Sequence, residues 1–120
     1  MNRFDKDIDP AFVRKVSTQF ILFHQGPGRK TTKADLAEVL RTHTRLIELA
    51  VNRLRQELVP IASDGGGYWL AREPAELDHP IRSMKHRLGE IHSTLRALES
   101  AREKMIHELT VEPSGQTILF

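Results

Sequence analysis

The chain has 120 residues, of which 39% are hydrophobic and 28% are charged, with a formal net charge of +2 and no cysteine. This length and composition predict one small globular domain, with or without an appendage, and they exclude disulfides and thiol chemistry. No apolar run approaches the length of a membrane span, and the charged segment MNRFDKDID lacks the apolar core of a secretory signal, so we expect a cytoplasmic protein.

The first predicted helix runs from about Pro10 to His24 and follows a flexible tail at residues 1–9. Asp9 before Pro10 is typical of a helix cap followed by a proline in the first turn. Apolar side chains then recur at steps of 3 and 4, at Val13, Val16, Phe20 and Phe23. This spacing predicts a helix that packs one face on a core.

The stretch from residue 31 to residue 58 predicts two short helices around a tight turn. Thr32, with Asp35 three residues later, is a typical start of the first helix. Arg41-Thr42-His43 breaks the pattern, and either Thr42 or Thr44 can cap the second helix. The apolar face of the second helix consists of Ile47, Ala50, Val51, Leu54 and Leu58. Two short helices separated by about three residues cross steeply, which is the helix-turn-helix arrangement.

A hairpin is predicted directly after these helices. Residues 59–63 and 68–70 are rich in strand-forming side chains, and Asp64-Gly65-Gly66-Gly67 between them supplies the positive φ that a hairpin turn needs. The order of helix, turn, helix and hairpin is that of a winged helix.

Residues 10–72 resemble the winged helix-turn-helix family, particularly its biotin-repressor-like branch and the small winged-helix proteins of phages and prophages. The resemblance rests on AEVL at 37–40, on three apolar positions of the second motif helix, and on VPIASDGGGYWL at 59–70. Those apolar positions are Ile47, Val51 and Leu54. The resemblance implies a DNA-binding domain in which residues 29–31 are either a short connection or the family's short first strand.

Residues 73–109 are predicted to hold a connection and a long dimerisation helix, with Asp78 as its cap and Pro80 in its first turn. Apolar residues recur there at alternating steps of 4 and 3, which is a heptad seam with Arg102 as its only polar member. The apolar members are Leu77, Ile81, Met84, Leu88, Ile91, Leu95, Leu98, Met105 and Leu109. The predicted fold is therefore mostly α with a small β-hairpin, a winged helix-turn-helix followed by a long C-terminal coiled-coil helix.

A second copy of the chain is the expected partner of this seam. About thirty helical residues span about 45 Å, which a small core cannot cover. The alternative is that the helix folds back on its own winged domain. In a parallel pair the flanking side chains would not attract one another, whereas an antiparallel pair places Lys85 opposite Glu99 twice. Such pairs are weak, and they favour the antiparallel orientation.

Residues 110–120 are expected to form a flexible tail that carries a short apolar motif. Gln116, Leu119 and Phe120 match the motif by which bacterial replication and repair proteins bind the sliding clamp of DNA polymerase, while Thr117 departs from it. The resemblance implies that the tail binds a bacterial sliding clamp. The alternative is that residues 118–120 pack on the protein's own core or add a strand beside the wing.

Positive charge is concentrated on the helix-turn-helix part of the chain. Residues 10–58 contain nine Lys or Arg and four acidic residues, a net of +5, whereas residues 73–112 contain six basic and eight acidic residues, a net of −2. This distribution is typical of a nucleic-acid-binding module with a separate oligomerisation element.

The resemblance implies that the second motif helix lies in the major groove of double-stranded DNA. We expect Arg45 to read a guanine edge and Asn52 an adenine edge, while cations at the start of the motif lie near phosphates. The candidate DNA-binding residues are Arg29, Lys30, Lys33, Thr44, Arg45, Asn52, Arg53 and Arg55.

The sequence also departs from the family at this face. Arg41 replaces the usual turn glycine, and the wing tip carries Asp64 without an arginine. Leu46, Glu48 and Leu49 add an acid and two apolar groups on or near the reading face. A protein-binding role of this face is therefore the alternative to DNA binding.

No arrangement typical of catalysis is present. The three consecutive glycines have no following Lys-Ser/Thr, and no serine, histidine and acid have a recognisable catalytic setting. Two His–Glu pairs at a spacing of four lie on the outer face of the long helix, where a solvated surface is the expected reading. We expect a non-enzyme with no cofactor and no metal site.

The predicted function is that of a small dimeric DNA-binding protein of phage or prophage type in transcription regulation or DNA replication. The alternative is a protein-interaction winged helix, which as a replication accessory factor would dock on the sliding clamp.

Overall fold

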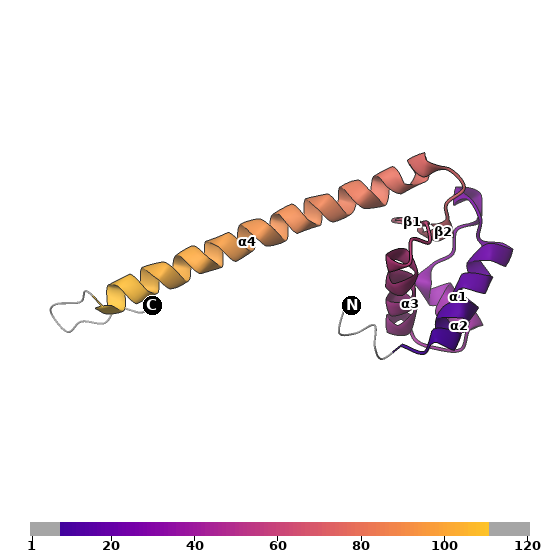
Figure 1. Cartoon of the computed structure of the whole chain (residues 1–120), viewed down its shortest axis with the longest axis horizontal. Helices are drawn as coiled ribbons and strands as arrows, with labels where there is room; N and C mark the ends of the chain where they lie inside the picture. Colours follow the sequence, from indigo (N-terminus) through magenta and orange to yellow (C-terminus); the bar gives the residue numbers. More distant parts are fainter. Residues whose placement is uncertain (1–7, 111–120) are drawn as a thin grey trace. The chain divides into compact units, whose positions relative to one another are not determined.

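The computed structural model describes residues 8–110, which form four α-helices, two 3-10 helices and one two-stranded antiparallel hairpin (Figure 1). The chain divides between Arg82 and Ser83 into two compact units, and each is described by itself. The predicted fold class is confirmed in its coarse form, because the chain is mostly helical with a small hairpin and a long C-terminal helix. The sliding-clamp motif at Gln116, Leu119 and Phe120 lies outside the described residues.

Helix α1 spans Pro10–Phe23 and begins as predicted. The Asp9 carboxylate accepts a hydrogen bond from the Ala11 amide at 2.9 Å, and Pro10 occupies the first helical position. The core extends two residues further towards the N-terminus than the predicted helix, because Ile8 is buried. Ile8 precedes the cap and lines the same small pocket as Val13, an apolar staple that fixes the entry of the chain into α1.

Helices α2 (Lys33–Val39) and α3 (Thr44–Gln56) are joined by a tight turn. Arg41 adopts a φ of +55° in this turn, where glycine is usual. The Thr42 amide donates back to the Ala37 carbonyl at 2.8 Å, which closes the end of α2. The predicted threonine cap of α3 is wrong. The cap is His43, whose imidazole Nδ1 accepts from the Leu46 amide at 3.3 Å, and Thr44 is already helical.

The predicted place of Leu58 on the buried face of α3 is also wrong. The helix ends at Gln56, and Leu58 takes a φ of +69° and is 89% exposed. The Val59 amide donates to the Leu54 carbonyl at 3.0 Å, so the backbone reverses there and turns the Leu58 side chain outward. The chain therefore leaves α3 two residues earlier than the apolar pattern indicates.

The hairpin consists of β1 (Ile61–Asp64) and β2 (Gly67–Leu70), with Ile61 paired to Leu70 and Asp64 to Gly67. Strand β1 starts later than the predicted residue 59, because the Val59 amide is used to close the end of α3. Thr31 pairs with Tyr68 through two hydrogen bonds of 2.7 and 2.8 Å, so the predicted short first strand is present as a single bridge.

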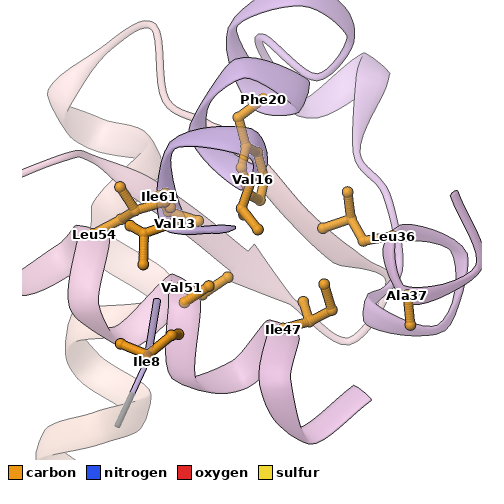
Figure 2. Packing of buried hydrophobic residues seen from close by; sticks show 11 residues of the cluster. Ile8, Val13, Val16, Phe20, Leu36, Ala37, Ile47, Val51, Leu54 and Ile61 are labelled. Atoms are coloured by element: carbon orange, nitrogen blue, oxygen red, sulfur yellow. The ribbon is translucent and has the colours of Figure 1, made fainter. Parts of the chain in front are cut away.

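The hydrophobic core joins the three helices to the hairpin. Figure 2 shows side chains from α1, α2, α3 and β1 gathered in one cluster, with Ile8 beside them. The cluster comprises Ile8, Val13, Val16, Phe20, Leu36, Ala37, Ile47, Ala50, Val51, Leu54 and Ile61. Because four of these residues lie on α3, the core fixes the rotation of this helix and hence the face that it turns to solvent.

A 3-10 helix, η3 (Pro74–Leu77), runs directly into α4 (Asp78–Thr110). The expected cap at Asp78 is wrong, because Asp78 has helical φ and ψ, and the capping role falls to Glu73 and Glu76. The Glu76 carboxylate accepts from the Glu73 amide at 2.8 Å and from the Trp69 indole at 2.7 Å, which holds η3 against β2. Within residues 8–110, no helix is both long and apolar enough to cross a membrane.

Candidate nucleic-acid interface

The outward face of α3 follows from its buried face. Ile47, Ala50, Val51 and Leu54 form the buried stripe. At 3.6 residues per turn, the polar residues on the opposite side of the helix are Arg45, Glu48, Asn52 and Gln56, and Leu49 lies among them. Arg45, Asn52 and Gln56 are exposed, and Glu48 is half-buried. This stripe of hydrogen-bonding side chains runs the length of α3 and includes both residues predicted to read bases.

Glu48 links the start of α2 to the start of α3. One of its carboxylate oxygens pairs with the Lys33 ammonium, and the other accepts from Arg45 Nη1 at 3.3 Å. The hydrogen bond from Lys33, together with the one from Arg45, lowers the pKa of Glu48. The same hydrogen bond raises the pKa of Lys33. Two of the predicted DNA-binding cations therefore meet at one carboxylate on the reading face.

Lys30 is held at the turn of the hairpin. Its ammonium lies 2.7 Å from Asp64 Oδ2 and 5.0 Å from the centre of the Trp69 ring. The second oxygen of Asp64 accepts from the Gly66 amide at 2.7 Å and shapes the turn. The Lys30 hydrogen bond, followed by that of Gly66, lowers the pKa of Asp64. Asp64 thus stabilises the hairpin turn, and Lys30 is its counter-ion.

The two arginines near the end of α3 have different settings. Arg53 pairs with Glu57 at 2.7 Å along the helix surface. Arg55 turns to the hairpin, where Nε donates to the Ile61 carbonyl at 2.9 Å and Nη2 donates to the Ser63 hydroxyl at 3.0 Å. Arg55 therefore connects α3 to β1. These hydrogen bonds give Arg55 a structural role that needs no DNA contact.

The three remaining predicted residues are exposed. Arg29 ends the short 3-10 helix η2 (Pro27–Arg29), and Thr44 is the first residue of α3. The Asn52 side chain makes no hydrogen bond within residues 8–110. Its amide is thus available at the middle of the outward stripe, which is the setting that base recognition requires.

Leu46 and Leu49 are not a free apolar patch, because both are half-buried and pack against the core. The exposed apolar side chains of the first unit lie elsewhere. Three of them are consecutive at the end of α1, namely Ile21, Leu22 and Phe23, and they are 52%, 62% and 54% exposed. A protein-binding surface on this unit would therefore be centred on the end of α1 and not on the reading face of α3.

The heptad seam of α4 is a long, exposed apolar surface. Ile81, Met84, Leu88, Ile91, Leu95, Leu98, Met105 and Leu109 are all exposed, while Leu77 lies in η3 and is half-buried. On the outer face, His86 Nε2 lies 2.6 Å from Glu90 Oε1. No group of three or more metal-binding side chains occurs among residues 8–110.

Several partners of the predicted cations can be read from sequence, and others cannot. Arg45 with Glu48 and Arg53 with Glu57 are spaced by 3 and 4 on one helix, which is the spacing of a surface pair. Lys33 with Glu48 and Lys30 with Asp64 are separated by 15 and 34 residues, so their pairing depends on the fold. Sequence reasoning therefore missed Glu48 and Asp64 as the partners of the predicted phosphate-binding lysines.

Neither a family model, nor a curated protein, nor a solved structure matches this chain. A functional proposal must therefore stand on the arrangement of its own residues.

Proposed function

We propose that the protein is a small dimeric DNA-binding protein of winged helix-turn-helix type, as in phages and prophages, acting in transcription regulation or DNA replication. The observation that carries this proposal is the outward stripe of α3. A helix held by its core residues after a tight turn, with Arg45 and Asn52 exposed on one line, has the form of a helix that enters a major groove. Asn52 suits an adenine edge and Arg45 a guanine edge.

The cations around this stripe suit the phosphates on either side of a groove. Lys33 opens α2, where the partial positive charge of the helix start adds to its own charge. Its pair with Glu48 is exposed, and exposed ion pairs contribute little because water and salt screen them. A phosphate can therefore replace Glu48 as the partner of Lys33.

The dimer is proposed from α4. Its exposed seam of leucine, isoleucine and methionine extends over residues 81–109, and an isolated helix gains most of its stability from packing such a face. A second copy supplies a matching face of the same length. Two DNA-binding domains in one particle bind DNA with higher avidity than one.

The salt dependence of binding to mixed duplex DNA tests the DNA role. Four to six phosphate contacts predict that log K falls with log salt with a slope of about −4 to −5. Lys30→Ala and Lys33→Ala should each weaken binding to all duplexes and make the slope shallower by about 1. Lys104→Ala removes the same charge from the outer face of α4 and serves as the matched control, with wild-type binding expected.

Base reading is tested separately on a selected binding site. Arg45→Ala and Asn52→Ala should each lower the discrimination between the preferred and a random duplex by about 1–3 kcal/mol. If both variants discriminate like the wild type, α3 does not read DNA. Absence of retardation at low salt and micromolar protein would overturn the DNA role as a whole.

The exposed apolar end of α1 favours a second candidate, a protein-interaction winged helix without DNA binding. Ile21, Leu22 and Phe23 present three large apolar side chains in succession, which is more than solvated helices usually expose. Under this proposal the protein is a replication accessory factor, and its C-terminal Gln116, Leu119 and Phe120 bind the bacterial sliding clamp.

The clamp contact is tested with a labelled peptide of residues 110–120 titrated with a bacterial clamp. Saturable binding below about 100 μM, equal to about −5.5 kcal/mol, is expected. The matched control is the same peptide with Leu119→Ala and Phe120→Ala, which should lose binding. Equal binding of both peptides, or of neither, would remove the clamp from the proposal.

A further inference from the structure

We propose that two α4 helices pair in antiparallel orientation, so that the dimer holds its two DNA-binding domains at opposite ends and bridges two DNA segments. This inference rests on the proposed dimer and the proposed DNA role. The occupant of the exposed seam is a second copy of the chain, and its orientation follows from the position of the charged residues on and beside the seam.

Arg102 decides against the parallel orientation. It occupies a seam position between Leu98 and Met105, both of which are apolar and exposed. In a parallel pair in register, each seam residue meets its own copy, so Arg102 would face the partner's Arg102 in a layer that excludes water. Like charges in such a layer repel each other at short range and cannot both be hydrated.

An antiparallel pair separates the two arginines. With the pair centred on residue 93, Arg102 of each chain faces the partner's Met84. The two arginines are therefore separated by about 18 residues along the axis of the pair. At 1.5 Å per residue this places the two guanidinium groups about 27 Å apart along the axis. That distance exceeds the screening length of about 8–10 Å at physiological salt, so their repulsion becomes negligible.

Apart from the two layers in which Arg102 faces the partner's Met84, the same register pairs apolar residues along the helix. Ile81 faces the partner's Met105, Leu88 faces the partner's Leu98, and Ile91 faces the partner's Leu95, each contact occurring twice by symmetry. Leu88 and Leu98 are 66% and 65% exposed in the single chain and would be covered at the middle of this interface.

The flanking charges agree with this orientation. Lys85 and Glu99 lie next to the seam on the same side, and the antiparallel pair brings each Lys85 to within two residues, about 3 Å along the axis, of the partner's Glu99. The parallel pair instead brings Arg87 to the partner's His92 and Thr94 to the partner's Glu99, and neither contact joins opposite full charges. Complementary charge beside the seam selects orientation in paired helices.

The orientation determines what the dimer can hold. Each α4 begins at Asp78, directly after the last turn of the winged domain. In an antiparallel pair centred on residue 93, the two starting points lie about 45 Å apart along the axis, since 30 residues rise about 1.5 Å each. The domains are therefore attached at opposite ends of the rod and can each bind a separate DNA segment.

Spin labels on single cysteines measure the orientation, and the chain has no native cysteine to remove. Ser93→Cys, Ser100→Cys and His107→Cys lie on the outer face of α4, one heptad apart. In the antiparallel pair, the label separation should rise from about 20–25 Å at residue 93, the width of two helices, to about 45–50 Å at residue 107. Equal separations of about 20–25 Å at all three positions would show a parallel pair and overturn the proposal.

Bridging is measured by recovery of a fluorescent duplex on beads that carry an unlabelled duplex. The wild type should retain the fluorescent duplex, and Leu95→Asp should lose this retention. Ser93→Asp adds the same charge on the outer face and should bridge like the wild type. DNA binding without bridging overturns the inference while the DNA role stands. A monomer in sedimentation overturns the inference together with the proposed dimer, and a dimer without any DNA binding overturns the DNA role and the bridge.

Discussion

The two units of the chain bury their apolar residues in different ways. In the first, side chains such as Phe20 and Ile47 are almost fully buried against residues distant in sequence. In the second, α4 shows a regular apolar seam from Met84 to Leu109, and every one of its apolar members is exposed. Periodic apolar residues thus predict a helix in both units, and only in the first does the same chain supply the surface that the helix packs against.

A helical pattern of apolar residues therefore predicts a helix, but it does not predict that the same chain supplies the surface on which the helix packs. A helix in water gains most of its stability from packing of its apolar face, and a 33-residue helix with an exposed seam lacks that packing. The first unit should therefore fold by itself, whereas the stability of α4 should depend on protein concentration.

The largest expected effect is the loss of the proposed dimer when a charge enters the seam. Leu88→Asp or Leu95→Asp should convert the dimer into a monomer in sedimentation and reduce the helix content, because two buried carboxylates would face apolar residues. Ser100→Asp on the outer face is the control and should remain dimeric. If the wild type is itself monomeric at high micromolar concentration, the heptad interpretation is wrong.

The second largest effect is expected from a cavity in the core of the first unit. Phe20 is 1% exposed, and Phe20→Ala should lower the free energy of unfolding by about 3–5 kcal/mol, measured by urea denaturation. Leu22 lies two residues further along α1 and is 62% exposed, so Leu22→Ala should change it by less than about 0.5 kcal/mol. Similar losses in both variants would show that the end of α1 is covered in solution.

Gly67 gives a smaller, local effect at the start of β2. A Cβ there would lie 2.4 Å from the Thr31 carbonyl oxygen, and the φ of Gly67 is +140°. Gly67→Ala should cost about 1–3 kcal/mol in the same denaturation experiment, because both the contact and the φ are strained. Gly65→Ala meets no atom within 4 Å and serves as the control, with no loss expected. Equal stability of the two variants would contradict the bridge between Thr31 and Tyr68.

The fold of the first unit was largely predictable because its signals are local. Helical spacing of apolar residues identified α1, α2 and α3, and the Thr32 cap was identified from its own residue type. The exceptions depend on single backbone reversals. Leu58 continues the apolar pattern of α3 yet lies in a turn of positive φ, and His43 caps that helix although threonines flank it. Ile8 was missed because it is a lone apolar residue in a charged segment.

The candidate site was less predictable, because its electrostatics depend on contacts between elements. The composition indicates an excess of cations over residues 10–58, but it does not indicate which of them have acidic partners. Glu48 and Asp64 each meet a lysine from another segment, and these contacts exist only in the folded chain. Arg55 shows the converse, since a predicted ligand-binding cation binds the backbone of β1.

Replacing the charged seam residue Arg102 should have a modest stabilising effect, in contrast to the destabilising substitutions above. Arg102→Leu should stabilise the dimer, since an apolar side chain then faces the apolar layer. A gain of about 1 kcal/mol would raise the melting temperature by about 4–8 °C. Arg96→Leu removes the same charge from a position outside the seam and should leave the melting temperature nearly unchanged. A lower melting temperature for Arg102→Leu would show that Arg102 has a partner across the interface.

The smallest expected effect concerns acid stability of the first unit. The pKa values of Glu48 and Asp64 are lowered, chiefly by hydrogen bonds from Lys33 and Lys30 respectively. The unfolded chain therefore binds more protons than the folded one near pH 4, so the contribution of these acids is complete above their unfolded pKa of about 4. This contribution to stability should be lost as the pH falls through the lower folded pKa values.

The double variant Glu48→Gln, Asp64→Asn should show a shallower fall of the free energy of unfolding between pH 5 and about pH 2. Because both pairs are exposed, the difference from wild type should shrink in high salt, and identical pH profiles at low salt would show that neither lysine holds its acid.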